Sequence, residues 1–237
     1  MSKYEILDKE KHRQLRVRTG YGAALGDAAM YVMTYPMEFR DIQSCYPILF
    51  TKDPNTGGFL AAAVMGFEAD QNLFLKEIGW DAFYIPVMVQ RQPFLIATGG
   101  EGDNEKPVVS LDLDHPRVSR DEGEALFDGE GNPTEFLNQK IALLDKLHRG
   151  LQHGKGFIET LLQHELLEQI TLDIAFNDGT KKSVQGFYTT AEERLYQLKG
   201  DVLESMNQAG YLQPAFMAVA SLSRVRDIIE RRNQLRV

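Results

Sequence analysis

Residues 48–67 read Ile-Leu-Phe-Thr-Lys-Asp-Pro-Asn-Thr-Gly-Gly-Phe-Leu-Ala-Ala-Ala-Val-Met-Gly-Phe, so two apolar runs flank a polar centre. The centre, Asp53–Gly58, is made of the residue types that turns favour. The runs on either side, Ile48–Lys52 and Phe59–Phe67, therefore predict the two strands of an antiparallel hairpin. Its loop is longer than the two-residue ideal.

The sequence around this hairpin predicts further short elements. Proline is tolerated in a first helical turn, and the residue before a proline avoids the helical region, so Pro36 and Pro47 delimit one short helix. The elements expected here are a strand at Tyr31–Thr34, the helix at Met37–Cys45, a short helix or turn at Ala82–Gln90, and strands at Phe94–Thr98 and Val108–Leu113 around a polar loop, Gly99–Lys106.

Residues 101–135 carry 11 acidic and three basic side chains and several glycines, which predicts a loop. Helices and one more hairpin are expected after it. Thr134 is the expected N-cap of the first helix, and Asn177-Asp-Gly179 is a strong hairpin signal. The predicted elements are helices at 135–147 and 156–164, strands from Glu168 to Phe176 and from Lys181 to Tyr188, helices at 191–198 and 202–209 capped by Thr190 and Asp201, and a last helix from Pro214 to Gln234.

These elements predict an α+β fold. The N-terminal half is rich in antiparallel sheet with short helices, and the C-terminal half is helix–β-hairpin–helix. We place a candidate boundary near residue 130, between a sheet-rich region at 1–130 and a helix–hairpin–helix region at 131–237. The two regions are expected to form one compact unit.

Composition excludes several classes of protein. The 237 residues are 43% hydrophobic and 25% charged, as in ordinary globular proteins, and the net charge of −8 disfavours general nucleic-acid binding. Cys45 is the only cysteine, which fits a reducing compartment. The charged N-terminus predicts no secretory signal, and no apolar run approaches the roughly 20 residues that span a bilayer. We expect a cytoplasmic protein.

No pattern in the chain predicts a metal or a cofactor. His148, His153 and His164 lack the i, i+4 spacing of helical zinc sites. The segment Asp128–Asn132 begins like a calcium loop, but Gln139 stands where that loop needs an acidic residue. Cys45 is expected in the core, and Ser221 is expected to bond within its helix.

One group of side chains points to recognition. Arg40, Trp80, Tyr84 and Arg91 lie in a segment dense in aromatic residues and prolines. Arginine supplies planar donors and stacks on aromatic rings, and Trp and Tyr are common anchors at interfaces. These four residues are the candidate ligand site. The structural alternative is that Trp80 fills the core while Arg91 pairs with an acid such as Asp81.

Several segments, in this order, resemble the bacterial SapC family. They are Pro47-Ile-Leu-Phe-Thr-Lys-Asp53, Asn72-Leu-Phe74, Trp80-Asp-Ala-Phe-Tyr-Ile-Pro86, Arg91-Gln-Pro-Phe94, Glu124-Ala-Leu-Phe-Asp-Gly-Glu-Gly131, Asp178-Gly-Thr180, Gly186-Phe-Tyr188 and Ala220-Ser-Leu-Ser223. The family is named after a surface-layer locus of a bacterial pathogen, and its members often sit beside flavin-dependent halogenase-like proteins, cupin-type proteins and TonB-dependent receptors. The resemblance implies no catalytic residues. A peptide-import permease of the same name needs several spanning helices and is a different protein.

The sequence and the resemblance together favour a binding or accessory protein that recognises a protein or peptide. The resemblance implies a link to a halogenase-like neighbour or to a surface-protein or TonB-receptor system. An enzyme acting on aromatic or peptide substrates and a surface-layer-associated protein stay open as alternatives. A homodimer is also compatible with the apolar stretch from Phe216 to Leu222.

Overall fold

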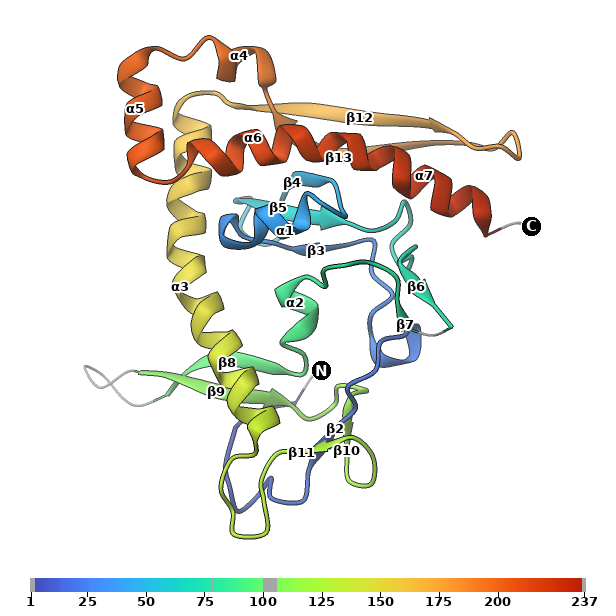
Figure 1. Cartoon of the computed structure of the whole chain (residues 1–237), viewed down its shortest axis with the longest axis vertical. Helices are drawn as coiled ribbons and strands as arrows, with labels where there is room; N and C mark the ends of the chain where they lie inside the picture. Colours follow the sequence, from blue (N-terminus) through green and yellow to red (C-terminus); the bar gives the residue numbers. More distant parts are fainter. Residues whose placement is uncertain (1–2, 78, 100–105, 236–237) are drawn as a thin grey trace.

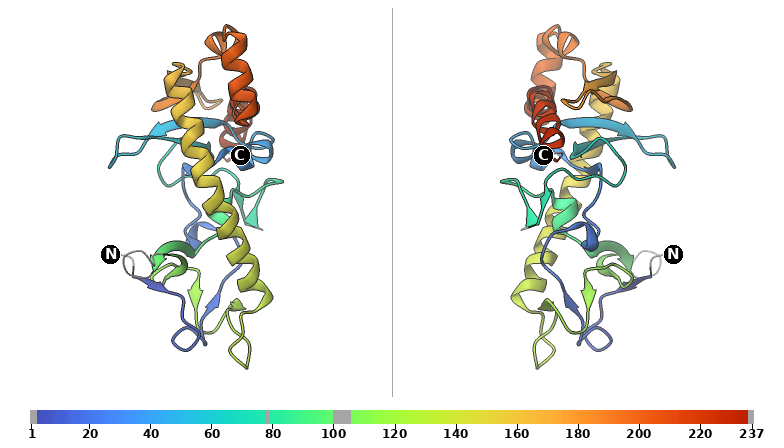
Figure 2. Two further views of the ribbon diagram at one scale, coloured as in Figure 1. Left: turned by 90° about the vertical axis from the view of Figure 1, so that its left-hand side faces the viewer. Right: turned by 90° about the vertical axis from the view of Figure 1, so that its right-hand side faces the viewer.

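A computed structural model describes residues 3–77, 79–99 and 106–235 of the chain. Its longest element is the helix α3 (Glu135–Gln163), which runs along most of the long axis of the molecule (Figure 1, Figure 2). The largest sheet lies beside one end of α3, and smaller sheets lie beside the other end. All strand pairs in the described part of the chain are antiparallel, and the predicted α+β fold is confirmed.

The largest sheet has five strands in the order β12–β13–β4–β5–β3. The hairpin predicted from Ile48–Lys52 and Phe59–Phe67 is confirmed and supplies its centre, and Ile48 lies opposite Ala63. The Asp53 carboxylate fixes the turn by accepting the backbone N–H groups of Asn55 and Thr56 at 2.8 and 3.0 Å. The strands are β3 (Tyr31–Met33), β4 (Ile48–Lys52), β5 (Phe59–Val64), β12 (Leu167–Ala175) and β13 (Lys181–Thr190).

The second predicted hairpin is confirmed as β12–β13. Phe176 N–H donates to the Thr180 carbonyl at 2.9 Å, which closes the loop, and Gly179 takes a φ of 82° that suits glycine. Along β12 the odd-numbered residues are exposed from Thr171 to Ala175, while Ile174 and then Phe176 are buried. The alternation in the sequence therefore correctly predicts which face of β12 is turned toward the core.

Three smaller sheets complete the strands, in the orders β1–β9–β8, β10–β2–β11 and β6–β7. The strand predicted at Val108–Leu113 is confirmed as β9, but the prediction of a loop across 101–135 is partly wrong, because the short strands β10 and β11 lie there and pair with β2. Residues 100–105 of the predicted polar loop lie outside the described residues. The strands are β1 (Tyr4–Ile6), β2 (Arg16–Val17), β6 (Leu75–Lys76), β7 (Gly79–Trp80), β8 (Phe94–Gly99), β9 (Lys106–Asp112), β10 (Val118–Ser119) and β11 (Glu124–Ala125).

The prediction of two helices at 135–147 and 156–164 is wrong, because α3 is one continuous helix. Thr134 is its N-cap, as predicted, and accepts the Leu137 N–H at 3.3 Å. Three glycines in its second half lower its intrinsic propensity, but they lie against Met37, Tyr35 and Tyr211 of neighbouring segments. Close packing at Gly150, Gly154 and Gly156 outweighs their low propensity.

Details of the last third also differ from prediction. Ala191 and Lys199, rather than Thr190 and Asp201, are the N-caps of α4 and α5, and the last predicted helix is interrupted by a 3-10 turn. The remaining helices and turns are η1 (Ala23–Leu25), η2 (Pro36–Glu38), α1 (Phe39–Ile42), α2 (Val87–Gln90), α4 (Glu192–Tyr196), α5 (Gly200–Gln208), α6 (Leu212–Ser221), η4 (Leu222–Arg224) and α7 (Val225–Gln234).

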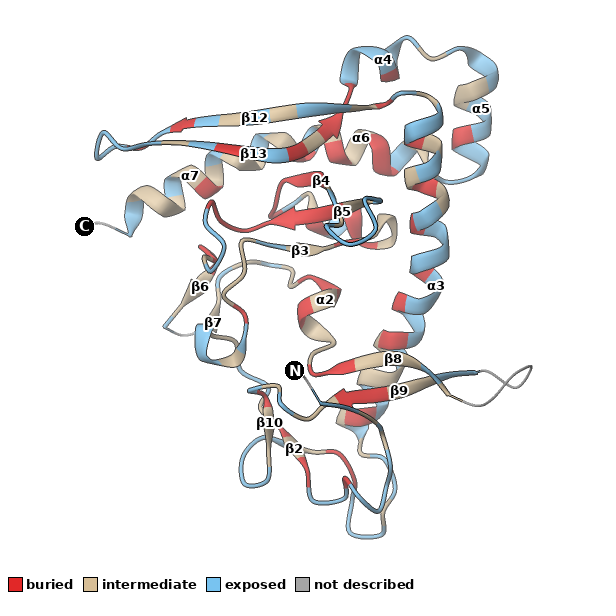
Figure 3. Cartoon of the chain, turned by 180° about the vertical axis from the view of Figure 1, so that it is seen from behind, coloured by how far each residue is buried: buried red, intermediate tan, exposed pale blue. Residues whose placement is uncertain are grey.

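Among the described residues, most buried apolar side chains fall into two clusters, and α3 contributes to both (Figure 3). The upper cluster packs the five-stranded sheet against α1, α6 and the second half of α3. The lower cluster packs β8, β9 and the N-terminal segments against the first half of α3. Each cluster draws residues from both sides of position 130, and the division into regions at that position stays a prediction.

The stretch from Phe216 to Leu222 packs inside the chain. Ala215 and Ala218 are buried in the upper cluster, and α6 contacts α1, β4 and β13. In the part of the chain that the structure describes, no helix combines the length and the apolar character needed to cross a membrane.

Candidate functional site

The candidate site is built around the segment from Trp80 to Val87, which joins β7 to α2. A relay of hydrogen bonds holds this segment to the body of the protein. Trp80 Nε1 donates to Tyr46 Oη at 2.7 Å, and Tyr46 Oη donates to the Tyr84 carbonyl at 2.6 Å. Burial raises the pKa of both Tyr46 and Tyr84, so their hydroxyls stay protonated and available as donors.

The relay ends on Glu38, a carboxylate that is only 1% exposed. Glu38 accepts hydrogen bonds from Thr34 Oγ1 at 2.8 Å, Tyr84 Oη at 2.9 Å and the Val87 N–H at 3.0 Å. Burial raises the pKa of Glu38, and these three donors oppose that shift only in part. Glu38 therefore anchors the far end of the segment through hydrogen bonds rather than through an ion pair.

The C-terminal helix holds the same segment from its other side. The Arg231 guanidinium lies over the Phe74 ring at 4.2 Å from the centroid. It donates to the Asp81 carboxylate at 2.6 Å and to the Asp81 carbonyl at 3.0 Å. The segment at residues 80–87 is thus held at Trp80 and Asp81 on one side and at Tyr84 and Val87 on the other. Its backbone position is set by partners that are distant in sequence.

A cavity of about 430 Å³ opens between this segment and α7. Phe83 stands at its edge and is wholly exposed to solvent. The polar lining is charge-balanced, because Arg231 pairs with Asp81 and Arg224 pairs with Asp227 at 2.9 Å. Such a cavity suits an uncharged apolar group flanked by polar backbone atoms. Its apolar lining consists of Cys45, Phe74, Trp80, Ala82 and Phe83.

A second cavity, of about 350 Å³, lies between α3 and the strands β3 and β5. Its walls are almost entirely apolar, and Leu151 and Leu162 of α3 are exposed beside it. The pair Lys155–Glu159, at 3.9 Å, is largely solvated. This cavity offers space but few groups that would orient a ligand, so the cavity at Trp80 and Phe83 is the stronger candidate.

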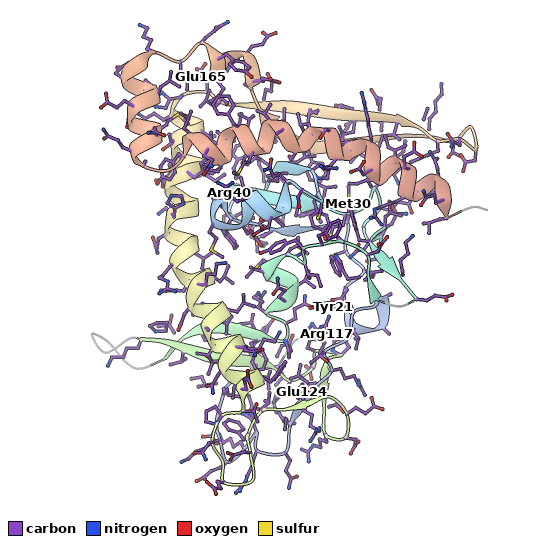
Figure 4. All side chains as sticks on the ribbon, in the orientation of Figure 1. Tyr21, Met30, Arg40, Arg117, Glu124 and Glu165 are labelled. Carbon is purple, nitrogen blue, oxygen red and sulfur yellow. The ribbon has the colours of Figure 1, made fainter. Side chains whose placement is uncertain are left out.

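The four residues singled out in the sequence do not share one cavity. Trp80 lines the cavity described above, and its ring packs edge-on against Tyr21 with centroids 5.7 Å apart. Tyr84 does not line this cavity, and its carbonyl is joined to the Trp80 indole through the Tyr46 hydroxyl. Arg40 is exposed on α1, with no hydrogen bond or ion pair to the described residues (Figure 4).

Arg91 lies apart from that cavity. It is half-buried and donates to the Phe94 carbonyl at 2.6 Å, and burial lowers its pKa. Asp81 pairs with Arg231 and not with Arg91. Sequence reasoning missed Phe83 and Arg231. Phe83 stood inside the quoted segment, but nothing local in the sequence showed that it would face solvent or that α7 would reach Asp81.

The other residues considered in the sequence as chemical candidates have hydrogen bonds or burial that serve the fold. The Asp128 carboxylate accepts the N–H groups of Glu130 and Asn132 at 2.9 and 2.8 Å, which makes the segment a turn. Cys45 is buried, as predicted. Ser221 donates within its helix to Ala218 and also accepts the N–H of Ile48 at 2.8 Å. The described residues hold no group of three or more His, Cys, Asp or Glu side chains that could bind a metal ion.

Comparison with known proteins gives one result. Neither the curated proteins nor the solved structures include a match to the chain. The SapC family model matches residues 7–228, which is nearly the whole chain. The chain belongs to the SapC family.

Proposed function

We propose that this protein is a binding module that holds an apolar side chain of a peptide or protein partner in the cavity at Trp80 and Phe83. The observation that carries the proposal is the wholly exposed ring of Phe83 at the edge of that cavity. A lone exposed apolar side chain needs no explanation, but here the ring adjoins a cavity that combines apolar side chains with two ion pairs.

The rigidity of the segment supports the same function. Trp80, Tyr84 and Asp81 are each held by hydrogen bonds to other elements, so Phe83 is presented from a fixed backbone. A partner that docks on a preformed surface loses less conformational entropy there, which favours affinity. Large aromatic side chains at the centre of a contact commonly supply most of its binding energy.

The nature of the partner is a further part of the proposal. The SapC resemblance favours a halogenase-like neighbour or a component of a surface-protein or TonB-receptor system. The charge-balanced cavity favours a segment with an uncharged apolar anchor. A second copy of this chain is a partner of the same kind, and sedimentation of the purified protein distinguishes a homodimer from a monomer.

Selection from a displayed random peptide library tests this function. We expect the wild-type protein to select peptides that share an apolar or aromatic position and bind at micromolar concentration. Phe83→Ser should weaken those peptides at least tenfold, which corresponds to about 1.4 kcal/mol. Tyr196→Ser, at an exposed aromatic residue of α4, is the matched control and should leave the affinity unchanged.

Two results would remove the proposal. One is a library from which the wild-type protein enriches no shared sequence. The other is a set of selected peptides that bind the Phe83→Ser protein as tightly as the wild type, since those peptides would occupy another surface.

A further inference from the structure

A different kind of cavity lies lower in the molecule, between the first half of α3, α2 and the segment at residues 17–21. It has a volume of about 230 Å³. In a chain of net charge −8, its described lining contains three basic side chains and no Asp or Glu. The polar lining includes Arg18, Arg117 and Lys140 together with the amides of Gln90, Gln92 and Gln139.

Arg117 is the most deeply placed of these cations, with a side chain only 3% exposed. Two hydrogen bonds of 2.8 Å join its Nη2 to the two carboxylate oxygens of Asp27. Its Nη1 donates to the carbonyls of Arg18 and Gly20, and its guanidinium lies 5.1 Å from the centre of the Tyr21 ring (Figure 4). Every contact of this group fixes its position beside the cavity.

One donor of Arg117 is left over. Its Nε is buried and has no partner among the described residues. A buried N–H without an acceptor costs about 1–3 kcal/mol, so such groups in native proteins usually have a partner. The amide oxygen of Gln92, which also lines the cavity, is likewise buried without a partner. Two residues of the cavity lining therefore each carry an unused polar atom, a donor on Arg117 and an acceptor on Gln92, and both atoms are closed to solvent in this structure.

Lys140 contributes a positive charge that has no counter-ion among the described residues of the cavity lining. Its Nζ donates to the Gln90 carbonyl at 2.7 Å, and it forms no ion pair with a described residue. Arg18, by contrast, pairs with Glu122 at 3.0 Å, and Arg117 pairs with Asp27. Burial, and then the charge of Arg117, lower the pKa of Lys140, as expected for a cation that lacks a counter-ion.

We propose that this cavity binds a small oxyanion, a carboxylate or phosphate, that also carries a hydroxyl group. On binding, a shift of the lining side chains would open these two buried atoms, so that the anion accepts hydrogen bonds from Arg117 Nε and Lys140 Nζ and its hydroxyl donates to the Gln92 amide oxygen. A volume of 230 Å³ equals the liquid volume of about eight waters, which is enough for either anion. This site is separate from the cavity at Trp80 and Phe83, and the proposal stands whether or not that cavity binds a peptide.

Calorimetric titration of the full chain tests the proposal, with inorganic phosphate and glycolate as probes at constant ionic strength. We expect saturable binding of at least one probe. Lys140→Met should weaken it at least tenfold, because the substitution removes the charge and keeps an apolar stem. Lys146→Met is the matched control, since Lys146 is an exposed lysine of the same helix. Substitution of Arg117 is avoided, because it would leave Asp27 buried and unpaired.

Acetate tests the role of the hydroxyl, because it differs from glycolate by that one group. The wild-type protein should bind glycolate more tightly than acetate, and Gln92→Leu should abolish the difference. Binding of phosphate alone assigns the phosphate form of the site, and binding of glycolate alone assigns the carboxylate form. The proposal is overturned if neither probe saturates, or if Lys140→Met binds as tightly as the wild type.

Discussion

At the scale of single residues, Glu38 has the most unusual surroundings. It is buried, accepts three hydrogen bonds and forms no ion pair with a described residue. In most proteins a buried carboxylate is paired with a cation. Here the carboxylate is stabilised by hydrogen bonds from Thr34, Tyr84 and Val87 and not by a cation, so its charge state depends on the local dielectric environment.

This makes the stability of the protein depend on pH in a defined direction. The pKa of Glu38 in the folded state is raised above the ordinary value of 4.5, so the folded state holds this proton more tightly than the unfolded state. The stabilisation from Glu38 is complete below pH 4.5 and is lost as the pH rises through the folded pKa. Glu38→Gln should flatten the fall in the free energy of unfolding across that range, as measured by urea denaturation at several pH values.

Glu193→Gln is the control for this measurement, because it removes one negative charge from an exposed position of α4. Its curve should run parallel to that of the wild type. If the Glu38→Gln curve also runs parallel to the wild type, Glu38 does not titrate in the way that its burial implies.

At the scale of elements, the sequence predicts both hairpins correctly. For the long helix α3 it predicts the N-terminus at Thr134 but not the continuity through residues 148–155. Both turns are encoded locally, by Asp53 and by Asn177-Asp-Gly179, and the strand alternation after Glu168 identifies its buried face. The continuity of α3 depends on partners of its glycines that are distant in sequence. The strands β10 and β11 are not predicted, because a strand of two residues is too short to show an alternation of apolar and polar side chains. Both strands pair with Arg16 and Val17, which are distant in sequence.

Gly123 shows how strictly these short strands depend on one residue. It precedes β11 and has a φ of 99°. A Cβ at this position would collide with the backbone carbonyl of Val17. Gly123→Ala should lower the free energy of unfolding by about 1–3 kcal/mol or more, because the positive φ and the collision both oppose the side chain. Chemical denaturation measures the change.

Gly129→Ala is the matched control in the same acidic region. A Cβ at Gly129 would have no heavy atom within 4 Å, apart from its chain neighbours, and its φ is not in the positive range. Its free energy of unfolding should stay within about 0.5 kcal/mol of the wild type. Equal effects of the two substitutions would contradict the role assigned to Gly123.

At the scale of the whole molecule, α3 connects two buried clusters. Leu137 and Leu144 lie in the lower cluster, while Phe157 and Leu161 lie in the upper one. The contacts that organise the molecule join positions far apart in sequence. Arg231 and Asp81 are 150 residues apart, and Arg117 and Asp27 are 90 apart. The sequence carries no local signal of such pairs, which is why Arg40 and Arg91 were grouped with Trp80 and Tyr84 although these residues do not line one cavity.

Because α3 is shared, the two clusters should open together. In hydrogen exchange of the wild-type protein, the slowest amides of β4–β5 and of β8–β9 should report the same opening free energy. Lys146→Pro should break α3 between the clusters at a cost of about 3 kcal/mol and make the β8–β9 amides exchange faster than the β4–β5 amides. Lys146→Ala is the control and should keep the two sets equal. Unequal opening energies in the wild type would show that α3 does not couple the clusters.

The position of Trp80 has a practical consequence. It is the only tryptophan of the chain, and its indole lines the cavity, touches Tyr21 and donates to Tyr46. Indole emission responds to the polarity around the ring, so the protein carries an intrinsic fluorophore at the place where a partner would dock. A change in the emission maximum on titration would report occupancy of this cavity without any label.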